Sequence, residues 1–135
     1  MQIREIMTKE VRLTSPEDSI QHAAQAMRDE DIGSLPVASG DRLVGYVTDR
    51  DIIIRGLAEG KGLDTRVQDV MTEKILYCFE DEDVDAVAAN MAENQVRRLP
   101  VLTRDKRLCG IVALGDIATS GDDDAAEDAL KEISR

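Results

Sequence analysis

Aromatic residues are scarce in this sequence, which has two tyrosines, one phenylalanine and no tryptophan in 135 residues. Any buried core must therefore be aliphatic, and the chain lacks the aromatic side chains on which nucleic acid bases stack. The formal net charge of −11 at pH 7 also repels phosphate backbones. We expect no general nucleic-acid binding, although a small anion can still bind where one cleft is locally positive.

Cysteines and long apolar runs are scarce as well. The two cysteines, Cys78 and Cys109, belong to a chain long enough to bury about two-thirds of its unfolded surface without cross-links. We therefore expect reduced or inert thiols in a reducing compartment. No apolar run approaches the roughly 20 residues of a membrane helix, and the N-terminus MQIREIMTKE has no signal-peptide core. These features predict a cytoplasmic protein without a membrane segment.

The sequence contains an internal repeat. At an offset of 64 residues, REIMT (4–8) matches QDVMT (68–72), and SLPV (34–37) matches RLPV (98–101). Between these matches lie two apolar stripes with the i, i+3, i+4, i+7 spacing of an amphipathic helix. The first comprises Ile20, Ala23, Ala24 and Met27, and the second comprises Val84, Val87, Ala88 and Met91. At an offset of 65, GYVTDRD (45–51) then matches GIVALGD (110–116).

Each copy predicts the order β-α-β-β-α. The first strand is expected near 11–14 or 75–79, and the last helix near Asp49 or Leu114. The prolines of SLPV and RLPV suggest a sheet edge or a bulge, because proline donates no backbone hydrogen bond. One copy alone leaves a sheet face bare. We therefore predict an α/β protein of the α+β type, with the two repeats packed sheet to sheet about a pseudo-twofold axis.

The expected organisation is repeat 1 at 1–58, a linker at 59–66, repeat 2 at 67–120 and an acidic tail at 121–135. The tail has acids before a short apolar pattern, and both a short helix and a disordered segment remain open.

The loop 45–51 has the composition of a nucleoside phosphate site. The Thr48 hydroxyl can hold a phosphate at a strand-to-helix junction. The Asp51 carboxylate is a two-oxygen acceptor suited to the paired hydroxyls of a ribose, and Gly45 permits close approach.

A structural alternative exists for the same residues, because Thr48 and Asp51 also have the spacing of a helix capping box. The second copy favours binding, since Ala113 cannot cap and yet Asp116 remains. An acid in the first helical turn is favourable by itself, so the alternative is weakened but not removed.

The doubled pattern resembles a stand-alone tandem pair of cystathionine β-synthase (CBS) domains over roughly residues 1–120. The first half, with GSLPV and GYVTDRDI, is also similar to bacterial hypoxic-response proteins of this family. The resemblance implies that Asp51 contacts ribose hydroxyls and that Thr48 contacts phosphate or ribose in one cleft. In the other cleft Asp116 has the first role, and Ala113 leaves the place of the hydroxyl empty.

The resemblance also implies further lining residues. Thr72, Ile75, Val96 and Arg97 are expected to face Asp51, and Lys9, Val11, Ile32 and Gly33 are expected to face Asp116. The loop residues Tyr46 and Val112 complete the predicted set together with Arg98. The pair Arg97–Arg98 suits phosphate, because guanidinium groups bind it through two donors; the alternative is a solvated pair balanced by nearby acids.

Other polar residues carry no predicted site. His22 is interpreted as a surface residue, and no Cys/His cluster suggests zinc. The acidic runs EDED (80–83) and DDD (122–124) lack the spacing of a calcium loop and precede predicted helices. No nucleophile has a paired base.

We therefore predict a regulatory module that binds AMP, ADP or ATP, with NAD or S-adenosylmethionine as further possibilities, and that senses energy state through a ligand-induced rearrangement. A homodimer with an unknown protein partner is expected. The alternative is a ligand-free scaffold whose clefts have decayed. Catalysis is not expected, because in catalytic family members the active domain is a separate one.

Overall fold

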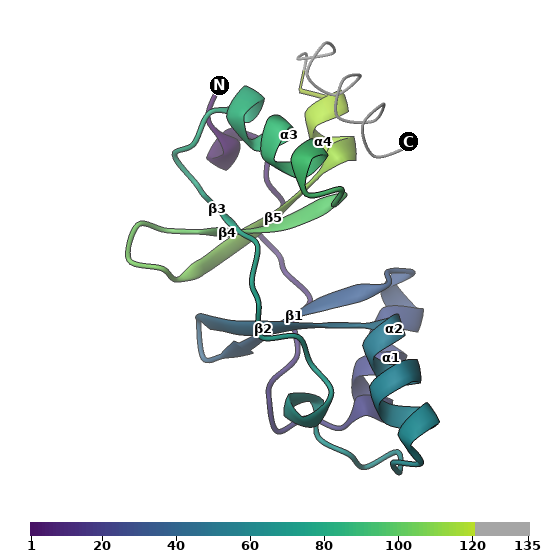
Figure 1. The fold of residues 1–135 in the computed structure, drawn as a ribbon. Coiled ribbons are helices and arrows are strands. Elements are labelled where there is room, and N and C mark those ends of the chain that lie inside the picture. The colour runs from purple at the N-terminus through teal and green to yellow at the C-terminus, as the bar shows by residue number, and fades with distance from the viewer. Residues whose placement is uncertain (121–135) are drawn as a thin grey trace. The chain divides into compact units, whose positions relative to one another are not determined.

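The computed structural model describes residues 1–120, and the tail predicted at 121–135 lies outside the described residues. Two small sheets and several helices alternate along the described chain (Figure 1), which confirms the predicted α+β class. The elements are α1 (Ile20–Glu30), β1 (Ser34–Ser39), β2 (Arg42–Thr48), α2 (Asp49–Asp51), β3 (Cys78–Phe79), α3 (Val84–Glu93), β4 (Arg98–Leu102), β5 (Leu108–Ala113) and α4 (Leu114–Ala118). Helix α2 continues as a π-helical stretch, Ile52–Gly56, and a 3-10 turn, Leu57–Glu59.

The chain forms two compact units whose limits differ from those of the repeats. The Asp51 unit comprises Arg12–Ile75, and the Asp116 unit comprises Met1–Val11 with the described residues from Leu76 onward. Each unit therefore contains most of one repeat and the N-terminal segment of the other. The expected sheet-to-sheet packing of the repeats stays a prediction.

In the Asp51 unit, β1 and β2 form an antiparallel hairpin that pairs Ser34 with Thr48 and Val37 with Gly45. Helices α1 and α2 lie on the same face of this hairpin (Figure 1). The buried core between them is aliphatic, as predicted. It consists of Ile20, Ala23, Ala26, Met27, Leu35, Val37, Val47, Ile52, Val67 and Val70.

In the Asp116 unit, β4 lies between β3, which is parallel to it, and β5, which is antiparallel. The proline of RLPV therefore does not lie in an edge strand. A bulge follows it, between Val101 and Leu102, and a bulge between Val37 and Ala38 follows the proline of SLPV. The predicted bulges are thus present. Pro100 also precedes Val101 and Leu102, the residues of β4 that pair with β3.

The first strand of each repeat is shorter than expected. Near 11–14 the structure has one isolated bridge, from Thr14 to Val37, and in the range 75–79 only Cys78–Phe79 is a strand. The helical stripes are as predicted with one correction. Ala24 is exposed, and Ala26 is buried in its place, because the helix turns that position away from the hairpin.

The N-terminal segments of the two repeats are exchanged between the units. In the Asp51 unit, the Val67 N–H donates to the Asp18 carbonyl at 2.8 Å. In the Asp116 unit, the Ile3 N–H donates to the Glu82 carbonyl at 2.9 Å. Each segment forms a 3-10 turn, Ile3–Glu5 or Val67–Asp69, whose first residue is fully buried. Neither repeat therefore completes its core with its own N-terminal segment.

Two glycines permit this exchange. The backbone of Thr72 pairs with that of Tyr46 through hydrogen bonds of 2.7 and 2.9 Å, and a Cβ on Gly45 would lie 2.8 Å from the Thr72 carbonyl oxygen. In the other unit a Cβ on Gly110 would lie 2.7 Å from Met7 Sδ and 2.9 Å from the Thr8 carbonyl oxygen. The close approach predicted for Gly45 is therefore made by a chain segment.

We expect Gly45→Ala and Gly110→Ala each to lower the free energy of unfolding by about 1–3 kcal/mol, the range for overpacked sites. The added methyl group must displace backbone at either position. Gly115→Ala is the matched control, because its Cβ would meet no atom within 4 Å among the described residues. Alanine also favours helix over glycine there. Chemical denaturation measures all three, and equal stability of Gly45→Ala and Gly115→Ala would contradict the packing argument.

Candidate ligand-binding site

Asp51 lies where β2 ends and α2 begins, and the residue is buried, with a relative exposure of 9%. The Thr48 N–H donates to Asp51 Oδ2 at 3.1 Å, and the Asp51 N–H donates to Thr48 Oγ1 at 3.0 Å. These two bonds form the reciprocal capping box of the structural alternative. A stabilising role for Thr48 and Asp51 is therefore established by the geometry, whatever else they bind.

A second hydroxyl contacts the same carboxylate. The Thr72 Oγ1 lies 3.2 Å from Asp51 Oδ2 and 3.3 Å from Oδ1. Thr72 belongs to the second repeat in sequence and to the Asp51 unit in structure. The carboxylate thus accepts from the Thr48 N–H and from the Thr72 hydroxyl, whose oxygen lies within reach of both carboxylate oxygens.

Arg55 is a neighbour of this site that the sequence analysis missed. Its Nη1 donates to the Met71 carbonyl at 3.2 Å. The signal that could have identified it is its position one helical turn after Asp51, which places both residues on one side of the helix. Arg55 fixes the backbone directly before Thr72.

The second copy of the loop retains half of the capping box. The Ala113 N–H donates to Asp116 Oδ2 at 2.8 Å, and Ala113 has no side-chain acceptor to reciprocate. The sequence argument that no reciprocal cap explains Asp116 agrees with this geometry, but it did not foresee the one-sided bond from the Ala113 N–H. The carboxylate satisfies a backbone N–H at the helix start even where the hydroxyl is absent, and so Asp116 has a structural reason to be present.

The remaining predicted residues fall in both units. Gly33 lies in the Asp51 unit, where its carbonyl accepts the Asp49 N–H at 3.0 Å, and Ile32 precedes it. Arg97 lies in the Asp116 unit, where its carbonyl accepts the Leu114 N–H at 3.0 Å, and Val96 precedes it. Their expected positions opposite the other loop stay predictions.

The other predicted ligand-binding residues differ in how far their side chains are exposed. The side chain of Val112 is fully buried in the core of the Asp116 unit, so it is removed from the set of side chains that can touch a ligand. Lys9 is exposed, and Val11, Tyr46 and Ile75 are half-buried. Arg97 and Arg98 are exposed and form no ion pair with another residue of the range 1–120.

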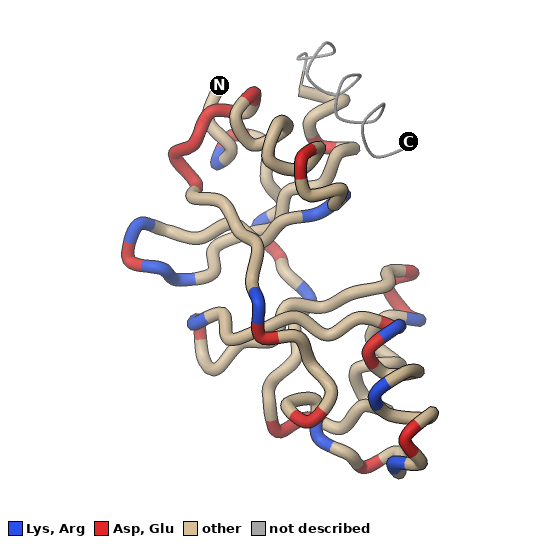
Figure 2. The backbone as a smooth tube through the Cα atoms, in the orientation of Figure 1, with Lys and Arg blue, Asp and Glu red and all other residues tan. Residues whose placement is uncertain are grey.

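The acidic run 80–83 binds the N-terminal segment of the chain. Figure 2 shows the run as a red stretch close to the N-terminus. The Arg4 N–H donates to the Glu80 carbonyl at 2.9 Å, and the Arg4 guanidinium lies 3.6 Å from the Glu80 carboxylate. Asp83 caps α3 by accepting the Asp85 N–H at 3.0 Å. The run therefore has a structural role in joining the exchanged segment to the unit.

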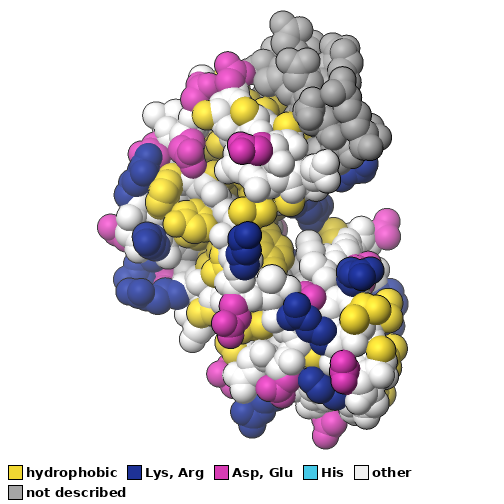
Figure 3. Space-filling model, viewed as in Figure 1, with side chains coloured by type: hydrophobic (Ala, Val, Ile, Leu, Met, Phe, Trp, Pro, Cys, Tyr) yellow, Lys and Arg dark blue, Asp and Glu magenta, His cyan; other side chains and the backbone are white. Residues whose placement is uncertain are grey.

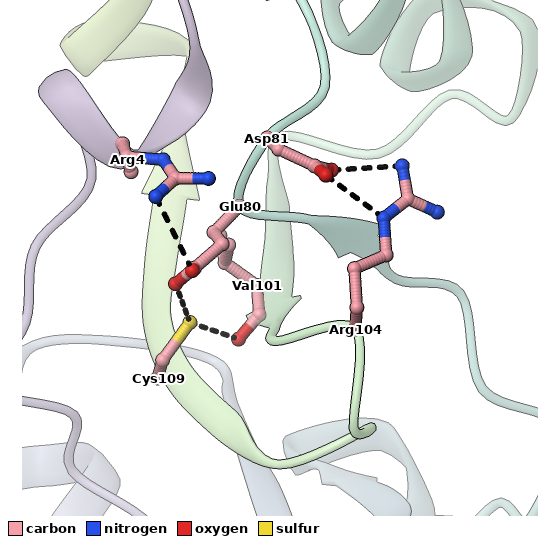
Figure 4. A network of polar contacts seen from close by, with 6 residues as sticks. All are labelled: Arg4, Glu80, Asp81, Val101, Arg104 and Cys109. Carbon is pink, nitrogen blue, oxygen red and sulfur yellow. Dashed lines mark hydrogen bonds and ion pairs between the residues drawn. The ribbon is translucent and has the colours of Figure 1, made fainter.

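Figure 4 shows how this run reaches the thiol of Cys109 and the guanidinium of Arg104. The Cys109 Sγ lies 3.3 Å from Glu80 Oε2, and Arg104 forms an ion pair of 2.8 Å with Asp81. Hydrogen bonding to Arg104 is the main cause that lowers the pKa of Asp81. Burial and the Glu80 carboxylate raise the pKa of the Cys109 thiol to about 11, and burial raises that of Cys78 to about 12.

The two thiols cannot be joined to each other. Cys78 in β3 and Cys109 in β5 lie on either side of β4, and strands two positions apart are about 9.5 Å from each other. A disulfide requires Cα atoms within about 7 Å. In the range 1–120 no group of three or more His, Cys, Asp or Glu side chains is placed to hold a metal ion. Neither thiol therefore belongs to a disulfide within the chain or to a described metal cluster.

The sequence of this chain matches the model of a known domain family. The model of the CBS domain matches residues 3–57 and 67–123, which includes both loops and both exchanged segments. The chain belongs to the CBS domain family. It contains two CBS domains in tandem, as the resemblance implied.

Individual relatives agree with this assignment. Hypoxic response protein 1 of Mycobacterium tuberculosis is 40% identical over 117 residues, which cover 85% of this chain and 81% of the relative. A crystal structure of Hypoxic Response Protein I with two coordinated zinc ions has a TM-score of 0.79 at 38% identity, and the match covers 89% of this chain and 98% of that one. The CBS domain pair of protein MJ0100, in complex with 5-methylthioadenosine and S-adenosyl-L-methionine, has a TM-score of 0.72 at 30% identity, covering 88% and 94%.

Among residues 1–120, none of the helices has the length and apolar character needed to cross a bilayer.

The raised pKa of the Cys109 thiol predicts slow alkylation of this residue. With a pKa of about 11, roughly one thousandth of Cys109 is thiolate at pH 8, so alkylation by iodoacetamide should be far slower than for a free cysteine. Burial is the largest cause of the raised pKa of Cys109 and remains in Glu80→Gln, which removes only the contribution of the carboxylate charge. The substitution should lower the pKa and speed alkylation of Cys109 roughly three- to tenfold, while the exposed Glu93→Gln should change nothing. Mass spectrometry of the modified peptides measures both rates, and rapid alkylation in the unmodified sequence would contradict the argument.

Proposed function

We propose that this CBS pair is a regulatory module that binds an adenosine-containing ligand, with the Asp51 carboxylate as the acceptor for the ribose hydroxyls. The supporting observation is the arrangement around Asp51, a buried residue whose carboxylate is contacted by the Thr72 hydroxyl and whose backbone N–H donates to the Thr48 hydroxyl. The protein MJ0100, a relative with the same fold, is bound to two adenosine derivatives, 5-methylthioadenosine and S-adenosyl-L-methionine.

The chemistry of a ribose fits this carboxylate. A vicinal diol presents two hydroxyl donors to two carboxylate oxygens, and hydrogen bonds to a charged acceptor are stronger than neutral ones. The Thr48 hydroxyl already accepts the Asp51 N–H, and its own proton remains to be donated, which suits a phosphate or ribose oxygen. AMP, ADP and ATP are therefore the first ligands to test, followed by S-adenosylmethionine and NAD.

Arg97 and Arg98 are the proposed phosphate contacts. They are exposed cations at the start of β4 in a chain of net charge −11, and phosphate is the group that a guanidinium binds best. Their contribution depends on the predicted placement of Arg97 opposite Asp51.

The proposed activity is regulation through binding. A ligand that binds one arrangement of the two repeats more tightly shifts the population toward it, and a partner protein then meets a different surface. The second candidate function, a ligand-free scaffold, is favoured by one specific observation. Both aspartates already accept a backbone N–H at a helix start, so neither requires a ligand to explain its presence.

Calorimetric titration with AMP separates the two candidates. We expect Asp51→Asn to weaken AMP binding by about 1–3 kcal/mol, the range for an unpaired polar group, while Asp116→Asn weakens it less. Asparagine keeps an oxygen that can accept the cap N–H, so both variants should remain folded. Absence of heat with AMP, ATP, NAD and S-adenosylmethionine in folded protein would favour the scaffold. A larger loss at Asp116 would reverse the order of the two sites.

We also propose a homodimer, in which the helix that follows Thr48 lies in the interface. Large apolar side chains are exposed on this helix and just after it: Ile53 at 53%, Ile54 at 48%, Leu57 at 57% and Leu63 at 56%. Figure 3 shows apolar atoms at the surface over this helix, between charged side chains. Clustered exposed apolar side chains are typical of interaction sites.

Ile53→Glu should shift this dimer toward monomer, because a buried isoleucine contributes about 1.5–3 kcal/mol and a buried unpaired carboxylate is unfavourable. Leu13→Glu is the control, since Leu13 is an exposed apolar residue outside this helix. Light scattering after size-exclusion chromatography gives the masses. A monomeric unmodified protein at high concentration, or an Ile53→Glu dimer as tight as the unmodified one, would contradict the proposed interface.

A further inference from the structure

The Thr72 hydroxyl occupies acceptor positions that the proposed ligand would need. It contacts both oxygens of Asp51, at 3.2 and 3.3 Å, while the Thr48 N–H contacts Oδ2 at 3.1 Å. Asp51 as a whole is 9% exposed, so few directions remain from which a donor can reach its side chain. Two ligand hydroxyls that bind both oxygens must therefore compete with the Thr72 hydroxyl.

Thr72 is also the last point at which the chain is fixed before it leaves the Asp51 unit. Its N–H and carbonyl pair with Tyr46 at 2.7 and 2.9 Å, and Arg55 fixes the Met71 carbonyl at 3.2 Å. In the described structure, the backbone of residues 73–75 forms no hydrogen bond. The chain then enters the Asp116 unit at Leu76. We call residues 73–75 the connector.

We propose that the Thr72 hydroxyl and the ligand hydroxyls compete for the Asp51 carboxylate, so that ligand binding releases the Thr72 side chain and loosens the connector. This inference rests on the proposed function and adds its regulation. A hydroxyl of the ligand replaces the Thr72 hydroxyl on Asp51, and the backbone pairing of Thr72 with Tyr46, no longer supported by the side chain, opens more often. Occupation of Asp51 is thereby transmitted to the connector, one of the two places at which the chain passes between its units.

The other unit lacks this competition and so provides an internal control. Thr8 corresponds to Thr72 in the repeat, and its backbone pairs with Ile111 in the same way, at 2.8 and 2.9 Å. Within residues 1–120, however, the Thr8 hydroxyl forms no hydrogen bond with Asp116, whose carboxylate accepts only the Ala113 N–H. The same fold is thus formed with and without the hydroxyl–carboxylate bond.

The sign of one mutational effect tests the proposal. Thr72→Val keeps the shape of the side chain and removes the competing hydroxyl. It should tighten AMP binding by roughly three- to tenfold, the range of a typical hydrogen bond. Thr8→Val should leave AMP affinity unchanged. With 2′-deoxyAMP, which has one hydroxyl fewer to place on Asp51, the gain from Thr72→Val should be smaller. Calorimetry on the full chain measures all of these constants.

Contrary outcomes separate the two proposals. If AMP binds, Asp51→Asn weakens it and Thr72→Val weakens it or has no effect, then Thr72 is a ligand contact or a bystander; the competition is overturned and the proposed function stands. If AMP binds neither the unmodified chain nor Thr72→Val, the proposed function fails and the competition fails with it.

Hydrogen exchange provides a second measurement that requires no affinity change. AMP should speed exchange of the Thr72 amide in the unmodified protein, and ligand-free Thr72→Val should already show faster exchange there. The Thr8 amide should not respond in either case. Unchanged exchange at Thr72 on AMP binding and in the variant would overturn the release of the connector.

Discussion

The exchange of N-terminal segments between the units is the constraint on which the rest of the structure depends. In each unit the second hairpin strand is an edge strand with a glycine, and the Met-Thr segment of the other repeat pairs with the backbone of that edge beside the glycine. Ile6 and Met7 pack against the core of the Asp116 unit, and Met71 packs against that of the Asp51 unit. Because a side chain at Gly45 or Gly110 would collide with the covering backbone, the glycines are required by packing. A single repeat therefore cannot fold as an isolated β-α-β-β-α unit with a complete core.

This exchange also determines the surroundings of Asp51. The covering segment ends in Thr72, and its backbone pairing with Tyr46 brings the threonine hydroxyl within reach of the carboxylate of Asp51, which lies 21 positions earlier in the chain. Thr8, the equivalent residue of the first repeat, belongs to the other unit. The hydroxyl next to Asp51 thus comes from the second repeat. A site of this kind depends on both repeats even though all of its described atoms lie in one compact unit, so a change in one repeat alters the chemistry of the other.

The repeats, helix stripes, hairpins and loop aspartates could all be predicted from the sequence, because duplication shows the same pattern twice and amphipathic spacing identifies the buried faces. The limits of the compact units could not be predicted, since periodicity describes which residues are buried and not which partner buries them.

Two predictions for individual residues failed, and one contact was missed. The prediction that Ala24 is buried was wrong because an alanine is small enough to lie on either side of a helix. The cap at Asp116 was missed because the capping pattern was treated as reciprocal, whereas a carboxylate can accept a backbone N–H without a hydroxyl in return. Val112 was chosen by its place in the loop, and strand alternation turns it into the core.

The differences between the two units bear on whether the Asp51 site is functional. Both units place an aspartate at the helix start and a threonine over a glycine, so these features follow from the fold. The Thr48 hydroxyl and the Thr72–Asp51 bond occur in the Asp51 unit alone among the described residues. Loss of an N-cap hydroxyl costs about 1 kcal/mol, and the Asp116 unit forms its helix without one. Since the fold tolerates both versions, packing does not require the additional hydroxyls around Asp51. The Thr48 hydroxyl accepts the backbone N–H of Asp51 and the Thr72 hydroxyl contacts its carboxylate, so the two units differ at this helix start by polar contacts that the fold itself does not demand.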